Sequence, residues 1–263
     1  MIFRRGRKRA GEPDDASLGE DEDVVETVRL EPEAGSPEAA QARAGGVSTN
    51  GDGPPGPETE IDVAALDARD WREDGPFDID EVDLEADTED DPPRIDLGSM
   101  VLTGFPGAEL RLQVAEETQQ IVSAMLVKGD SALELGAYAA PRSGGLWAEL
   151  RDEIIESATE AGGSAALVEG PFGVELRRLL PVSTPDGEQG YQPSRMWVVE
   201  GPRWLLRGIV YGQAALEDGL DSPVAELVAA FRHVVVRRGD EAMAPGDLLP
   251  LRLPEGVNPS AAS

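Results

Sequence analysis

The sequence predicts an α+β fold, with a mostly antiparallel sheet and two amphipathic helices on one face, preceded by a long disordered acidic N-terminal segment. Three observations support this prediction. Charge is distributed unevenly along the chain, short apolar runs of strand length alternate with turn residues, and only two stretches have the three- and four-residue apolar spacing of a helix. The pattern does not follow the regular strand–helix alternation of a nucleotide-binding sheet.

The first 91 residues differ in composition from the rest of the chain. They carry 28 acidic and 9 basic side chains, a formal charge of −19, whereas residues 92–263 carry −10. A segment with high net charge and few aromatic residues cannot bury enough apolar surface to offset the entropy lost on ordering. We therefore expect a disordered acidic tail at residues 1–70, with a basic tip at Arg4–Arg9, and a second disordered tail at residues 256–263.

Residues 71–91 interleave acidic with apolar side chains, a composition typical of a segment that docks onto a folded surface. The surface could belong to a partner or to this protein's own domain. The protein's own domain is favoured because a short apolar segment beside a domain is often part of its fold. The expected anchors are Trp71, Phe77, Ile79 and Val82.

The first half of the α+β domain, which we place at residues 92–255, has the pattern of successive strands. One run alternates strictly between polar and apolar side chains, and the next is apolar on both faces, as in a central covered strand. Gly129 can adopt positive φ without a Cβ clash, so a hairpin turn is expected there. The expected strands span residues 97–102, 109–114, 121–127 and 133–137.

The second half of the domain contains both expected helices. Apolar side chains recur at helical spacing from Leu146 to Ala158, and Gly162-Gly163 ends this helix. A shorter helix follows Ser222-Pro223, a pair that suits a helix cap and first turn, and its apolar stripe ends at Phe231. Further strands are expected at residues 165–168, 173–182, 196–200, 204–211 and 234–236, with an extended edge at residues 248–253.

Five short motifs occur together and in order along the domain. They are Gly75-Pro76-Phe77-Asp78 and the stretches 94–99, 140–147, 169–173 and 201–208. This set resembles an actinobacterial family known only as a domain of unknown function, DUF3710, over roughly residues 70–255. The resemblance implies a cytoplasmic bacterial protein whose acidic head varies while the domain persists. It implies no activity, ligand or catalytic residue.

The residue inventory removes most classes of enzyme. The chain has no Cys and one His, His233, so thiol nucleophiles, Cys-ligated metals and three-histidine metal sites are excluded. No serine lies in a Gly-x-Ser-x-Gly elbow that could pair with His233. Adjacent carboxylates are expected by chance among 52 acidic residues. We therefore expect no catalytic residue, metal or cofactor, and do not expect an enzyme.

Two arginines around a tryptophan form a candidate binding site. On a strand, Arg203 and Arg207 would share one face and could clamp a carboxylate of a ligand or of a docked acidic segment. The simpler interpretation pairs these arginines with Glu175 or Glu200 on neighbouring strands and places Trp204 in the core.

A third arginine precedes the first helix. The stretch Pro141–Gly145 places Arg142 beside the backbone donors of a helix N-terminus, which could attract an anion. The candidate ligand- or partner-binding residues are therefore Arg142, Arg203, Trp204 and Arg207.

Charge and hydropathy limit the partners of the protein. An isoelectric point near 4.2 argues against direct nucleic-acid binding by the domain. No apolar stretch approaches the roughly 18 residues of a membrane span, so none is expected. The basic tip at residues 4–9 imitates the start of a signal peptide, but the apolar segment that should follow is missing, which favours the cytoplasm.

The leading hypothesis is a non-enzymatic cytoplasmic protein-interaction domain, adaptor- or chaperone-like, with an unknown protein partner or a homodimer as its assembly. The alternatives are a small-anion or metabolite sensor that uses Arg142, Arg203 and Arg207, and a metal-assisted carboxylate enzyme. A large exposed apolar patch would favour the first hypothesis, and a closed pocket lined by Arg and Trp would favour the second. Clustered inward-facing carboxylates would favour the third.

Overall fold

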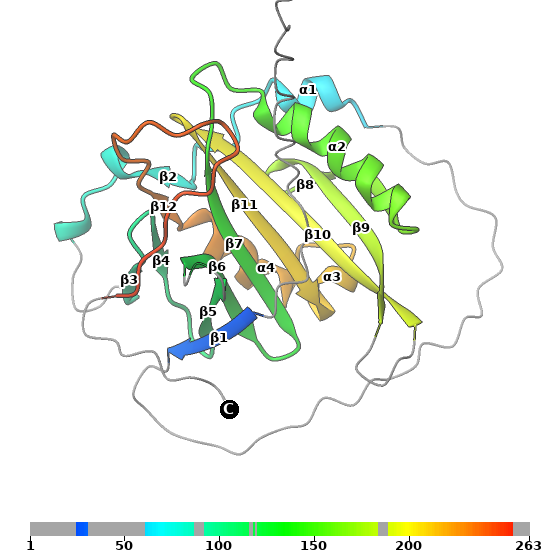
Figure 1. The fold of residues 1–263 in the computed structure, drawn as a ribbon, viewed down its shortest axis with the longest axis horizontal. Coiled ribbons are helices and arrows are strands. Elements are labelled where there is room, and N and C mark those ends of the chain that lie inside the picture. Colours follow the sequence, from blue (N-terminus) through cyan, green and yellow to red (C-terminus); the bar gives the residue numbers. More distant parts are fainter. Residues whose placement is uncertain are drawn as a thin grey trace, which may run out of the picture.

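The computed structural model describes residues 61–86, 92–115, 118, 120–183 and 189–254, together with the backbone of residues 25–30. Within these ranges the chain has the predicted α+β fold, with one sheet of eight strands and one of four (Figure 1). The basic tip, most of the predicted acidic tail and the C-terminal tail lie outside the described residues. Two elements lie within the predicted tail, namely strand β1 (Val25–Leu30) and helix α1 (Val63–Asp67).

The large sheet is antiparallel throughout and has the order β1-β5-β6-β7-β11-β10-β9-β8. Besides the edge strand β1, it consists of two meanders, β5–β7 and β8–β11, which meet where β7 pairs with β11. The seven strands β5–β11 occur where strands were predicted, and Gly129 has the expected positive φ of 55° in the β6–β7 turn. The bounds are β5 (Glu109–Ala115), β6 (Gln120–Lys128), β7 (Ser131–Ala139), β8 (Ser164–Gly170), β9 (Gly173–Ser183), β10 (Gln189–Gly201) and β11 (Trp204–Gly212).

The small sheet joins residues that are far apart in the chain. Its order is β2-β12-β4-β3, with β2 and β12 parallel and the other pairs antiparallel. The extended edge predicted at residues 248–253 makes only isolated bridges, such as Leu251 with Gly98. The bounds are β2 (Phe77–Asp78), β3 (Arg94–Asp96), β4 (Met100–Thr103) and β12 (Val235–Val236).

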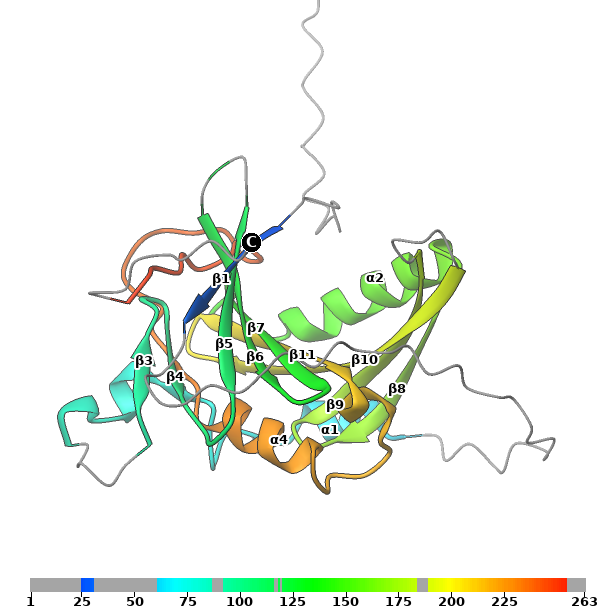
Figure 2. The same cartoon turned by 90° about the horizontal axis from the view of Figure 1, so that it is seen from below.

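The two long helices lie on opposite faces of the large sheet, as Figure 2 shows, and not on one face as predicted. Helix α2 (Leu146–Glu160) packs in a cluster with Leu205 of β11, whereas α4 (Val224–Arg232) packs in a cluster with Leu206. Successive strand residues point to opposite faces, so β11 is apolar on both sides and requires cover on both sides.

The short elements connect these layers. Helix α3 (Gln213–Leu216) follows β11, and the 3-10 turns η1 (Ile79–Glu81) and η2 (Leu84–Ala86) follow β2. Helix α4 begins where expected, but the predicted cap is not made: Pro223 occupies the N-cap position, and no side-chain hydrogen bond caps the helix.

A buried carboxylate fixes the segment around β2 to the large sheet. Asp78 is 7% exposed, and its Oδ2 accepts a hydrogen bond of 2.6 Å from the indole N–H of Trp204, which is fully buried. The backbone N–H of Phe77 donates to the carbonyl of Val234 at 3.0 Å. The described part of the predicted docking segment, residues 71–86, is therefore held against this protein's own domain at Phe77 and Asp78.

We predict that Trp204→Phe lowers the free energy of unfolding by about 1–3 kcal/mol, because Oδ2 of buried Asp78 loses its indole donor. Trp197→Phe is the matched control, since Glu175, which accepts from Trp197, also accepts from Arg195 and so keeps partners. Urea denaturation should show the larger loss for Trp204→Phe. Equal losses would mean that ring shape, and not the hydrogen bond, determines the effect.

Candidate functional site

The predicted arginine clamp is not formed. Arg203 lies in the turn between β10 and β11 with φ +63°, so it does not share a strand face with Arg207. Its guanidinium donates to the carbonyl of Gly239 at 3.1 Å. Arg207 lies on β11, 3.9 Å from the carboxylate of Glu134 and 5.0 Å from the ring centre of Tyr138. The clamp fails because the strand begins only at Trp204, which is buried in the core.

The helix N-terminus that could have attracted an anion is occupied by the protein's own carboxylate. Oε2 of Glu200 accepts a hydrogen bond of 2.8 Å from the backbone N–H of Gly145, and Oε1 accepts one of 2.6 Å from that of Trp147. Arg142 is exposed in the loop before α2. The sequence analysis missed this role of Glu200, because it arises from a contact between residues about 55 positions apart.

The four predicted anchors of the docking segment are all half-buried: Trp71, Phe77, Ile79 and Val82. Trp71 packs directly against Gly173, where an added Cβ would lie only 2.7 Å from its indole nitrogen. The indole N–H donates to the carbonyl of Leu66 at 2.8 Å, and the guanidinium of Arg69 lies 4.2 Å from the ring centre.

An ion pair holds this segment in its bent conformation. The guanidinium of Arg72 donates to Glu81 at 2.9 and 3.0 Å and lies 5.4 Å from the ring centre of Trp204. Hydrogen bonding from Arg72, together with the backbone N–H of Asp78, holds the pKa of Glu81 below its ordinary value.

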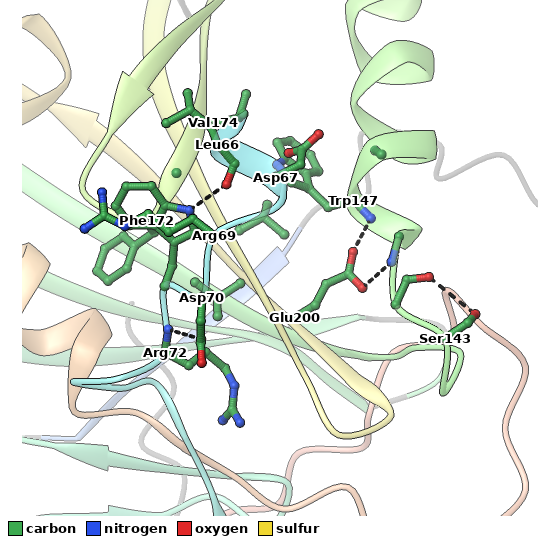
Figure 3. A pocket seen from close by; sticks show the side chains of 17 residues that line it. Leu66, Asp67, Arg69, Asp70, Arg72, Ser143, Trp147, Phe172, Val174 and Glu200 are labelled. Carbon is green, nitrogen blue, oxygen red and sulfur yellow. Dashed lines mark hydrogen bonds between the residues drawn. The ribbon is translucent and has the colours of Figure 1, made fainter. Parts of the chain in front are cut away.

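A pocket of about 350 Å³ lies between this segment and the domain. Residues 66–72 form one wall, the start of α2 forms a second, and the adjoining ends of β9 and β10 form a third (Figure 3). Three aromatic side chains line it: Trp71, Trp147 and Phe172. Its charged lining residues are Asp67, Arg69, Asp70, Arg72 and Glu200.

The charges of the pocket wall are largely compensated within the protein. The guanidinium of Arg151 donates to both carboxylate oxygens of Asp67, at 2.7 and 2.8 Å, and this hydrogen bonding raises the pKa of Arg151. Asp70 accepts from the backbone N–H of Arg72 at 2.9 Å. The pocket therefore offers no uncompensated cluster of one charge.

One residue that lines this pocket has a buried polar atom without a partner. The indole nitrogen of Trp147 is buried and makes no hydrogen bond, and it is the one side-chain atom of this kind in the part of the chain that the structure describes. The other three indoles donate to Leu66, Glu175 and Asp78, at 2.8, 2.7 and 2.6 Å. A buried N–H without an acceptor costs roughly 1–3 kcal/mol.

A separate surface gathers the exposed large apolar side chains of the described residues, and we call it the apolar face. Leu179 and Tyr191 lie on one side of the β9–β10 hairpin, because cross-strand pairing places them opposite Pro193 and Pro181. All four side chains of the apolar face are well exposed to solvent. The exposed fractions are 40% for Leu179, 61% for Tyr191, 60% for Leu216 and 50% for Leu220.

A buried ion pair attaches the loop that carries Leu220 to the same side of the hairpin. Glu175 is 1% exposed and accepts from the guanidinium of Arg195 at 2.8 and 2.9 Å and from the indole of Trp197 at 2.7 Å. Arg195 also donates to the carbonyls of Glu217 and Gly219, at 3.1 and 3.2 Å. The loop between α3 and α4 therefore covers the middle of the hairpin and leaves its far end uncovered.

The described residues contain neither a candidate metal site nor a helix that could span a membrane. No group of three or more His, Cys, Asp or Glu side chains there could hold a metal ion. No helix there is long and apolar enough to cross a membrane. His233 is exposed at the C-terminal end of α4, where its backbone N–H donates to Ala229.

Comparison with known proteins gives one match. The sequence model of a family described as "Protein of unknown function (DUF3710)" matches residues 75–260. No curated protein and no solved structure matches the chain. The matched region begins after residues 66–72, which form one wall of the pocket.

We predict that Glu200→Ala lowers the free energy of unfolding by about 1–2 kcal/mol, because two backbone N–H groups at the start of α2 lose their acceptor. Glu200→Gln should lose less, since its amide oxygen can still accept. Glu149→Ala, an exposed position in the first turn of α2, is the control and should change stability by less than about 0.5 kcal/mol. Urea denaturation measures all three, and a loss for Glu149→Ala as large as that for Glu200→Ala would contradict the capping role.

We predict a pH-dependent contribution from Glu81. Its pKa is lower in the folded than in the unfolded protein, so its stabilising effect is complete above the unfolded pKa and is lost as pH falls through the folded pKa. Glu81→Gln should therefore be less stable than wild type by a few tenths to about 1 kcal/mol at pH 7, and the difference should disappear in acid. Glu85→Gln, at an exposed position in η2, is the control. A difference that is constant with pH, measured by urea denaturation, would contradict this assignment.

Proposed function

Because the chain belongs to the DUF3710 family, whose description names no activity, we propose from the geometry that it is a non-enzymatic protein-interaction module. The apolar face is its docking surface. The setting that we propose is the cytoplasm of an actinobacterium, on the strength of the motif resemblance.

One observation carries the proposal: of the four large apolar side chains that are at least 40% exposed in the described residues, Leu179 and Tyr191 share one face of the hairpin. The other two, Leu216 and Leu220, flank the loop that Arg195 holds on that same face. Apolar side chains scattered singly over a surface need no explanation, whereas a gathered set marks an interaction site. Tyr191 is the natural centre of such a site, because tyrosine combines a large contact area with a polar tip.

The shape of this region also supports docking. β8 pairs with β9 only as far as Leu179, and β11 pairs with β10 only from Arg195 onward. Beyond these residues β9 and β10 form a two-stranded ribbon that extends from the sheet, toward the lower right of Figure 1. Two strands alone gain little stability from each other. A partner that covers the ribbon would therefore bury apolar area that the protein's own fold leaves exposed.

The charge of the chain indicates the kind of partner. At a formal charge of −29, two copies repel each other, and a partner with basic groups around an apolar centre is favoured. Residues 1–91, which carry −19 of this charge, would attract the same partner over longer distances. A heterologous basic protein is therefore our proposed occupant, and self-association is the competing outcome.

The test uses site-specific photo-crosslinking in cells of the organism that makes the protein. We expect a benzophenone amino acid at position 191 or 216 to give adducts with one other protein, and the same group at Gln192 to give none. Gln192 is the matched control, because it is exposed on the same strand and points to the opposite face. Tyr191→Ser should abolish the adduct formed from position 216.

Two results would contradict the proposal. Adducts at position 192 as strong as those at position 191 would mean that the partner does not contact the apolar face in preference to the opposite face of the hairpin. Adducts of the chain with itself alone would show that the apolar face forms a homodimer and does not bind a different protein.

A further inference from the structure

We propose that the pocket between residues 66–72 and the start of α2 binds a small, neutral, planar molecule that presents a hydrogen-bond acceptor to the indole of Trp147. This inference is independent of the apolar face, which lies at the other end of the β9–β10 hairpin. It assigns a ligand site to residues that the proposed interaction does not use.

The size and walls of the pocket suit a small molecule. Its volume of about 350 Å³ lies within the range of roughly 300–1,000 Å³ that is usual for small-molecule sites. Trp71, Trp147 and Phe172 reach it from three separate segments of the chain. Aromatic walls favour a flat ring, because stacked and edge-to-face contacts add to the burial of apolar area.

The charges of the pocket indicate a neutral ligand. Asp67 is paired with Arg151 and Arg72 with Glu81, and the carboxylate of Glu200 accepts hydrogen bonds from two backbone N–H groups. Asp70 and Arg69, the remaining charged groups of the wall, have opposite signs. These two charges balance, so a charged ligand would meet one charge of each sign while losing its hydration, which is unfavourable.

The indole of Trp147 indicates the hydrogen bond that the ligand would make. The chain has four tryptophans, and the other three donate to a carbonyl or carboxylate within 2.8 Å. A carbonyl oxygen or ring nitrogen of the ligand would supply the acceptor that Trp147 lacks. The gain is large for one contact, because a buried donor that stays unpaired carries its full desolvation cost.

Binding requires one wall to move, because the indole nitrogen of Trp147 is closed off from solvent in the empty pocket. Helix α1 is the wall best able to do so. It has only five residues, none of them buried, and Leu66 and Asp67 at its end line the pocket. The ion pair of Asp67 with Arg151 attaches it to α2. The proposed binding includes a shift of α1, limited by this ion pair, that opens a path from the pocket to the indole.

The four indole N–H groups allow a direct test by nuclear magnetic resonance of the ¹⁵N-labelled full-length protein. Nicotinamide and uracil are the neutral probes, and benzoate and benzylamine are the charged comparators. The Trp147 resonance is identified by its loss in Trp147→Phe. We expect the neutral probes to move this resonance downfield, as hydrogen bonding does, while the resonances of Trp197 and Trp204 stay in place.

Two further variants keep the test independent of the folding of Trp147→Phe. Ala148→Phe fills the pocket and keeps the indole, so it should weaken binding of the neutral probes by at least about tenfold. Glu149→Gln, at an exposed position on α2, should bind as wild type does. If the neutral probes leave the Trp147 resonance unmoved, or if Ala148→Phe binds them unchanged, the ligand site is wrong. If benzoate or benzylamine binds and the neutral probes do not, the neutral class is wrong.

Discussion

A fully buried glutamate determines how the parts of this molecule fit together. Glu175 on β9 accepts hydrogen bonds from Arg195 and Trp197 on the neighbouring strand, and Arg195 continues to the loop between α3 and α4. Removing one member of such a buried pair typically costs about 3–5 kcal/mol, because the other charge is left unpaired in a low dielectric. The contact therefore fixes the register of the hairpin and the position of the loop beside it. It also places the boundary between the covered and the uncovered part of the hairpin.

The hairpin formed by β9 and β10 connects the two surfaces that we assign. Phe172 and Glu200 lie where its strands meet the rest of the domain, and both line the pocket. Leu179 and Tyr191 lie toward its far end, where α3 and α4 no longer cover it. The two strands are thus apolar on both faces at the end near the pocket. A buried ion pair holds their middle, and at the far end one apolar face is exposed. A single supersecondary unit accounts for both candidate sites.

Local sequence patterns predicted much of the fold and little of the sites. Alternation and helical spacing placed the strands and both long helices, because these patterns depend on neighbours within a few residues. They could not place α2 and α4 on opposite faces, since that depends on which strands lie side by side. Arg203 was misplaced because the turn extends one residue further than its polar–apolar pattern suggests. The capping role of Glu200 and the pairing of Glu175 with Arg195 are tertiary contacts, which leave no local signal.

The position of helix α1 has a consequence for how relatives of this protein could diverge. The family match starts at Gly75, so residues 66–72, which form one wall of the pocket, precede the matched region. Because α1 buries none of its side chains, substitutions there leave the core intact. A change of side chains in this stretch would alter the wall of the pocket while leaving the packing of the domain unchanged.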